Sequence, residues 1–130
     1  MASGLAATTL ANKWLNMLGG TAFTAPSTFV QLHTGEPGAA GTSNVSSVTT
    51  RPAITWAAAS AGAIAIAATF PAWSNWAGTN GEVVTNISVW DASSSGNFLF
   101  SVLLTLAKTI NTGDTATLSS MTMTFTPIAA

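Results

Sequence analysis

The residues with the most chemical potential lie together in the segment His33-Thr34-Gly35-Glu36. His33 is the single histidine of the chain, and Glu36 could partner it in a hydrolytic dyad or supply a second metal ligand. A metal ion needs further ligands, and Glu82, Asp91 and Asp114 follow in separate predicted turns. We therefore predict no catalytic residue, no metal site and no cofactor. We interpret His33 as a residue that shapes its loop by bonding to nearby carbonyls.

Two other aspartates have the spacing of turn caps. Asp91 precedes Ala-Ser-Ser-Ser-Gly, and Asp114 closes the sequence Asn-Thr-Gly-Asp. An Asp side chain in such a position accepts backbone N–H groups of its own turn. The pattern predicts a capped turn at Asp91 and a compact hairpin connection ending at Asp114.

Four tryptophans could instead recognise a ligand: Trp56, Trp73, Trp76 and Trp90. Aromatic faces stack on sugars, so these rings could form a carbohydrate platform. The chain has no tyrosine, however, and a β-sandwich core also needs large side chains. We favour a role in the core or a subunit interface, and keep a carbohydrate-binding module as an alternative that requires exposed tryptophans.

Charge is scarce along the whole chain. Of 130 residues 5% are charged, whereas Ser and Thr fill 35 positions and Ala another 24. An ordinary globular protein has about a quarter of its residues charged. A surface of hydroxyls and amides is easily desolvated, which suits faces that pack against neighbours in a large assembly. Three basic residues and a net charge of -1 predict no nucleic-acid partner, and the absence of Cys excludes disulfides and thiolate ligands.

Membrane insertion is also not expected. No stretch of 18 or more apolar residues occurs, and the first residues lack the basic and apolar regions of a signal peptide. We expect a protein made in the cytoplasm, with no membrane partner.

The elements that must position these residues begin with a helix. Leu10, Trp14 and Leu18 recur at helical spacing between a capping Ser3 and the stop signal Gly19-Gly20. The pattern predicts a helix over about residues 4–18 with Trp14 at its buried centre. Residues 1–20 then form the N-terminal helix and residues 21–130 one β-sandwich domain.

Beyond residue 20 the periodicity changes to two. Strands are predicted at residues 29–32, 50–57, 63–70, 83–90, 98–106, 115–118 and 121–125, with a long loop at 35–49. Pro52 lacks a backbone donor, so its strand should start there or lie on an edge. The fold class is mainly β: an antiparallel β-sandwich, jelly-roll or Ig-like, of about seven strands with one N-terminal α-helix. The core is expected to contain Ile54, Trp56, Ile64, Ile66, Ile87, Val89 and Leu103.

One segment also carries a family resemblance. Leu32-His33-Thr34-Gly35-Glu36-Pro37-Gly38 resembles the Leu-His-Thr-Gly/Ala-x-Pro-Gly segment of a family of small tailed-phage virion proteins. As in that family, the segment follows an N-terminal helix and precedes an Arg-containing strand, here around Arg51. An Asp-Ala-x-x-x-Gly turn and a Gly-Asp pair follow in the same order, here at 91–96 and 113–114.

The resemblance implies a non-enzymatic structural protein of a tailed-phage virion. We expect a capsid decoration (cement) protein on the capsid exterior, bound to the major capsid protein and to itself as a homotrimer. A minor tail or fibre-associated protein is the alternative. The loop at 35–49 is expected to be floppy until it pairs with a neighbouring subunit. The candidate assembly contacts are Trp14, His33, Thr34, Gly35, Glu36, Pro37, Gly38 and Arg51.

Overall fold

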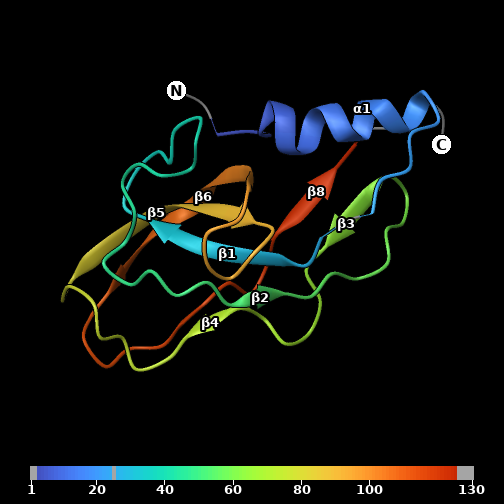
Figure 1. Ribbon diagram of the computed structural model, residues 1–130. Coiled ribbons are helices and arrows are strands. Elements are labelled where there is room, and N and C mark those ends of the chain that lie inside the picture. The colour runs from blue at the N-terminus through green and yellow to red at the C-terminus, as the bar shows by residue number, and fades with distance from the viewer. Residues whose placement is uncertain (1–2, 25, 126–130) are drawn as a thin grey trace.

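The computed structural model describes residues 3–24 and 26–125, which form an antiparallel β-sandwich with an N-terminal helix (Figure 1). This confirms the predicted fold class. In the described residues the strands are β1 (Thr28–His33), β2 (Ala53–Ile54), β3 (Ala63–Ala65), β4 (Ala72–Trp73), β5 (Glu82–Trp90), β6 (Phe98–Ile110), β7 (Ala116–Thr117) and β8 (Thr122–Thr124).

Four strands form the main sheet in the order β2-β1-β5-β6, and two small sheets pair β3 with β8 and β4 with β7. The short β4 was not predicted. The turn between β6 and β7 forms as expected, because Asp114 N donates to Asn111 O at 3.0 Å. Its interpretation as a hairpin connection is wrong, because β7 pairs with β4 instead of β6.

The N-terminal helix begins later than predicted. A π-helical turn, η1 (Ala7–Ala11), leads into α1 (Asn12–Leu18). The preceding residues are taken up by the sheet: Leu5 bridges Phe100 of β6, and Ala6 N donates to Leu99 O at 2.7 Å. Since this backbone already pairs as a strand, it cannot also start the helix.

The predicted stop at the glycine pair is confirmed, with Gly20 at a φ of 84°. The predicted cap is not, since no side chain caps the start of the helix. Trp14 is half-buried, and Leu10 is the buried residue of the helix. The expectation of Trp14 as the buried centre was therefore wrong.

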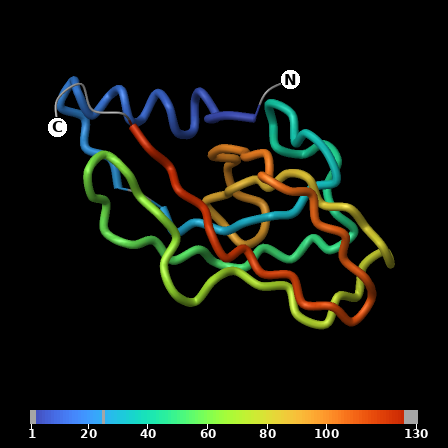
Figure 2. The backbone as a smooth tube through the Cα atoms, turned by 180° about the vertical axis from the view of Figure 1, so that it is seen from behind, coloured from blue at the N-terminus to red at the C-terminus, as the bar shows by residue number. Residues whose placement is uncertain are grey.

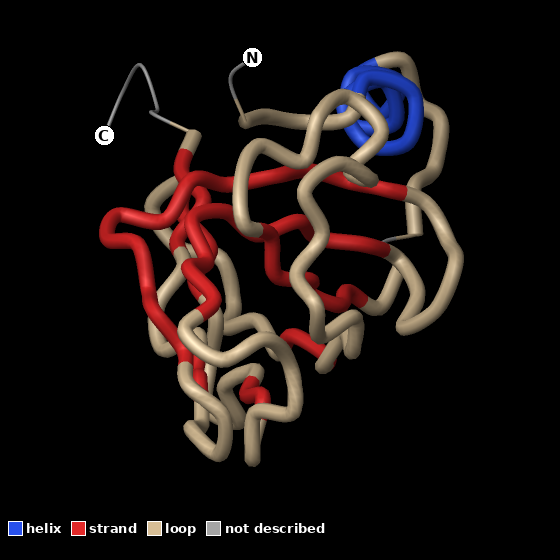
Figure 3. Tube along the Cα trace, turned by 90° about the vertical axis from the view of Figure 1, so that its left-hand side faces the viewer, coloured by secondary structure: helices blue, strands red, loops and turns tan. Residues whose placement is uncertain are grey.

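The helix lies across one end of the strand layers, as the views from behind and from the side show (Figures 2 and 3). The C-terminal strand β8 runs up to it in Figure 2. There the rings of Trp14 and Phe125 meet edge to face, with centroids 5.4 Å apart. This contact holds the helix against the end of the chain that follows β8.

The prediction for Pro52 is confirmed. β2 begins at the next residue, Ala53, and lies at the edge of the main sheet. Pro52 still uses its carbonyl, which accepts a hydrogen bond of 3.0 Å from Val30 N. A residue without a backbone donor is thus accommodated where no ladder bond is required of it.

The apolar face of the main sheet forms the core. Of the residues expected there, Ile54, Ile66, Ile87 and Val89 are buried, and Trp56 and Ile64 are half-buried. Leu103 is 66% exposed, so its assignment to the core was wrong. The register explains the error. Leu103 is opposite Asn86, on the face of the sheet that carries polar side chains.

Candidate assembly interface

Apart from the exposed Leu103, the second face of the main sheet carries polar side chains that are buried in its middle rows. Gln31 of β1, Ser88 of β5 and Ser101 of β6 lie in one row across three strands. We call the buried polar residues of this face and the adjoining Trp90 the polar face: Gln31, His33, Asn86, Ser88, Trp90 and Ser101. Arg51, the N-terminal segment and the loop at 35–49 make hydrogen bonds to it.

Every described buried side-chain nitrogen or oxygen has a hydrogen-bond partner. Burying such atoms without partners would cost on the order of 1–3 kcal/mol each. Each buried polar group of this face therefore has a hydrogen-bond partner. The hydrogen bonds from the covering segments hold those segments against the sheet.

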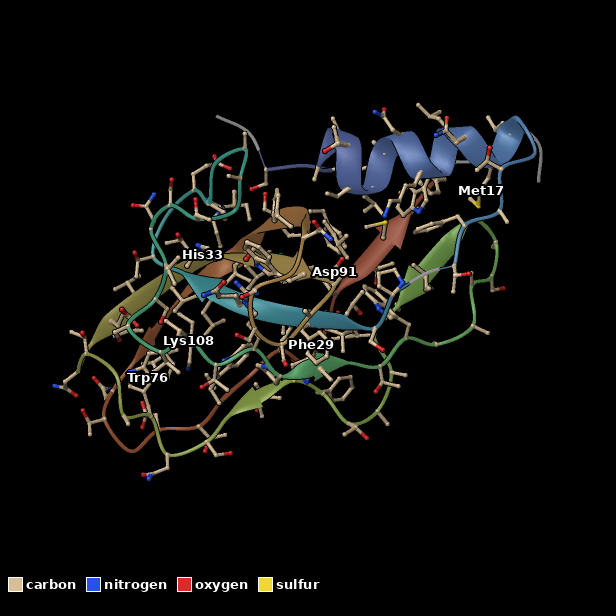
Figure 4. All side chains as sticks on the ribbon, in the orientation of Figure 1. Met17, Phe29, His33, Trp76, Asp91 and Lys108 are labelled. Atoms are coloured by element: carbon tan, nitrogen blue, oxygen red, sulfur yellow. The ribbon has the colours of Figure 1, made fainter. Side chains whose placement is uncertain are left out.

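His33 is the centre of this arrangement (Figure 4). Its ring is 0% exposed, with Nδ1 2.8 Å from Ser43 O and Nε2 2.7 Å from Ser88 Oγ. Trp90 Nε1 donates to the same Ser88 oxygen at 2.8 Å. The interpretation of His33 as a loop-shaping residue is confirmed.

Burial is the largest influence on the His33 ring and lowers its pKa below the ordinary value of 6.5. The hydrogen bond to Ser43 O opposes this shift, and the positive charge of Arg51 adds to it. A neutral ring is the form that this environment favours.

The Ser88–His33 distance is also that of a serine nucleophile and its base. Both residues are 0% exposed, so no substrate can reach the hydroxyl in this conformation. Among the described residues, no three His, Asp or Glu side chains group closely enough to hold a metal ion. The contact that the structure does show for this pair is with the loop, through His33 Nδ1 and Ser43 O.

The loop at 35–49 is anchored at both ends. Near its start, Ser3 Oγ donates to Glu36 Oε1 at 3.1 Å. Near its end, Glu82 of β5 accepts hydrogen bonds from Ser46 Oγ at 2.7 Å and from Ser47 N at 2.9 Å. The expectation of a floppy segment was wrong, since these contacts order the loop within its own domain.

The predicted contact residues differ in how far they reach the surface. His33 and Pro37 are buried, and Thr34 is exposed. The others are half-buried: Trp14, Gly35, Glu36, Gly38 and Arg51. Trp14 lies on the helix. All the others lie in or beside the loop at 35–49, which covers the polar face.

The two turn caps are confirmed. Asp91 Oδ1 accepts from Asn97 N at 2.6 Å, and Asn111 N donates to Asp114 Oδ2 at 2.9 Å. Burial acts to raise the pKa of the Asp91 carboxyl, but hydrogen bonds from the side chain and backbone of Asn97, the positive charge of Lys13 and a hydrogen bond from the backbone of Asp91 itself together outweigh it. The pKa of Asp91 therefore lies below its ordinary value.

Three of the four candidate tryptophans are buried and present no face to a sugar, and Trp56 is half-buried. Trp73, Trp76 and Trp90 are 4%, 2% and 6% exposed. Their indole N–H groups bond inside the protein, as Trp73 Nε1 does to Thr50 O at 2.9 Å. The carbohydrate alternative required exposed rings, and these three rings are buried.

The N-terminal helix, where Trp14 was predicted to make an assembly contact, also carries exposed apolar side chains. We call this surface the α1 patch: Leu5, Trp14, Leu15, Met17, Leu18 and Phe125, which with Ala11 line a hollow of about 600 Å³. Leu15, Leu18 and Phe125 are 63%, 88% and 62% exposed, and Met17 lies at the far end of the helix in Figure 4. The sequence signal was present, because Leu15 and Leu18 lie one turn apart beside Trp14. Of the residues in this patch, Trp14 alone was predicted as an assembly contact.

Among the described residues, no helix is long and apolar enough to cross a membrane. No curated protein matches the chain. A family model does match it over residues 5–126, and that family is described as Podophage GP4 fiber I protein gp80. The match agrees with the phage virion family expected from the sequence and covers the helix, the loop and every strand. The chain therefore belongs to the family of podophage GP4 fiber I protein gp80 and is a phage structural protein.

Proposed function

We propose that this chain is a building block of a phage fibre, which acts by packing against further copies of itself and carries out no reaction. The observation that carries the proposal is the family match over residues 5–126, since the matched family is named for a fibre protein. The sequence alone favoured capsid decoration, with a fibre-associated protein as the alternative. The family name supports the fibre alternative.

The surface chemistry supports a building block. With 5% charged residues, the chain presents mainly hydroxyl, amide and apolar groups. Such groups can be buried between subunits without the desolvation cost of charges. The buried polar face is already occupied by the chain's own loop, so the surface left for a neighbour is elsewhere.

The α1 patch is our candidate for that surface, and its proposed occupant is a second copy of the chain. None of its residues is charged, so a strongly charged partner would find no complementary group there. Two copies meeting patch to patch would bring no like charges together.

The number of copies in the assembly is part of the proposal. A homotrimer on a threefold axis is the arrangement expected from the sequence, and a pair related by a twofold axis would use the same patch on both copies. Sedimentation velocity of the purified chain over a range of concentrations counts the copies. A chain that stays monomeric at all concentrations would contradict self-packing.

Labelling of intact phage tests the fibre itself. Gold-labelled antibody against this chain should decorate projections from the particle, at a copy number far below that of the major capsid protein. Uniform labelling of the shell, at a copy number comparable to that of the major capsid protein, would favour the decoration alternative and overturn the fibre proposal.

A further inference from the structure

One edge of β1 is covered by two different parts of the chain. β2 pairs with its first half, at Thr28 and Phe29. Residues 44–46 of the loop, which we call the edge cover, pair with its second half. Thr34 N donates to Asn44 O at 2.8 Å, and the N–H of Ser46 donates to a β1 carbonyl at 3.0 Å. The cover thus hides backbone groups that could otherwise pair with another strand.

His33 fastens this cover to the sheet. The residue belongs to β1, forms a bridge with Val45 and bonds through Nδ1 to Ser43 O, directly before the cover. Its other nitrogen, Nε2, bonds to Ser88 Oγ of β5. One buried ring therefore connects the loop to two strands of the main sheet.

The contacts of the ring define its protonation state. A carbonyl oxygen accepts and never donates, so Nδ1 carries the hydrogen opposite Ser43 O. Nε2 then accepts from the Ser88 hydroxyl, which itself accepts from Trp90 Nε1–H. A second ring proton would point at the Ser88 oxygen and force that hydroxyl to turn its own hydrogen elsewhere.

The charges around the ring do not compensate such a proton. Arg51 is the charged residue that acts on the ring, and its charge is also positive. The carboxylates near the loop are engaged elsewhere: Glu36 accepts from Ser3, and Glu82 accepts from residues 46 and 47. Protonation would therefore place an unpaired cation in a buried site.

We propose that His33 is a pH-sensitive fastener: when its ring takes up a proton, the edge cover separates from β1 and leaves that edge open to another strand. The main sheet and the contact between Ser3 and Glu36 remain in place, so the change is local. Burial of the ring in the closed form determines whether acid or base opens the cover. The exposed ring of the open form titrates near its ordinary value of 6.5, above that of the closed form, so acid favours opening.

Hydrogen exchange of single amides, measured by NMR, tests the proposal. The probes are Ser46 N–H and Thr34 N–H, with Val89 N–H inside the main sheet as the reference. Below about pH 6.5, protection of the two probes, corrected for intrinsic exchange, should fall by up to about tenfold per pH unit. Protection of Val89 should not fall with them. The His33 ring signals should titrate over the same pH range.

The matched variant is His33→Gln, whose side chain has no titrating group. Its probe amides should keep constant protection over the range in which those of the natural chain lose it. If this variant does not fold, the ring titration and the two probes of the natural chain still decide the matter. Equal loss at Val89 would mean global unfolding, and protection independent of pH would mean that the ring is no fastener. Either result would overturn the proposal.

Discussion

The Arg51 guanidinium lies over the ring of Trp90, with its Cζ atom 3.8 Å from the ring centroid. The same side chain donates from Nε to Gln31 Oε1 at 3.0 Å and from an Nη atom to Ser95 O at 2.7 Å. It thereby ties the segment before β2 to β1, β5 and the turn at 91–97. We expected Arg51 to be an assembly contact, and the structure engages its charged end within its own chain.

Replacing Arg51 by Lys should therefore lower stability, although the charge is kept. An ammonium cannot reproduce the planar fork that serves Gln31, Ser95 and the ring at once. We expect a loss of about 1–3 kcal/mol in the free energy of unfolding, measured by denaturant titration. Lys108→Ala, at an exposed residue, is the control and should change little. Equal stability of Arg51→Lys and the natural chain would show that the fork contributes nothing.

The carboxylate of Asp91 should govern part of the acid response. Because its pKa is lowered in the folded state, its ionised form stabilises the fold above the ordinary value of 3.8. That contribution is lost as the pH falls through the lower folded value. Asp91→Asn should lower the free energy of unfolding by about 0.5–1.5 kcal/mol near neutral pH. Its stability should also depend less on pH in the acid range. Thermal unfolding measured from neutral to acid pH tests both effects. If the stability of the variant and of the natural chain fell equally with acid, the role of the Asp91 carboxylate would be contradicted.

Gly41 should be intolerant of a side chain. Its φ is 70°, and a Cβ built there would lie 2.5 Å from Cδ2 of Phe98. Gly113 is the matched control, since its φ is 88° but no atom lies within 4 Å of such a Cβ. Both Ala variants carry backbone strain, and Gly41→Ala should lose about 1–3 kcal/mol more because of the clash. Equal losses in denaturant titrations would mean that the loop does not press on Phe98.

The α1 patch should control self-association. Leu18→Lys places like charges at the proposed contact of two copies and keeps the helix, because a cation suits a helix C-terminus. The apparent dissociation constant should rise at least about tenfold, since burial of a Leu is worth about 1.5–3 kcal/mol. Sedimentation velocity measures this rise.

The control is Leu106→Lys, since Leu106 is 82% exposed and lies outside the patch. It should associate like the natural chain. If Leu106→Lys dissociates and Leu18→Lys does not, copies meet at β6 and the patch has another role.

Local patterns in the sequence were sufficient to predict the longer strands of the main sheet and the residue at which the helix ends. The alternation of Val30 and Leu32 with Gln31 and His33 predicts a strand, because successive side chains point to opposite faces wherever the chain is extended. The consequences of Pro52 and of the glycine pair after the helix also depend only on the backbone of those residues.

Tertiary structure decided which face of each strand is covered, and by what. Alternation separates the polar side chains of His33 and Ser88 from the core, but it does not reveal that a loop and an Arg side chain bury them. Leu103 was misplaced for the same reason, and β7 was assigned the wrong partner. Strand pairing and burial depend on residues distant in the chain, and a hydrogen bond such as that between His33 and Ser88, 55 positions apart, leaves no periodic signal in the sequence.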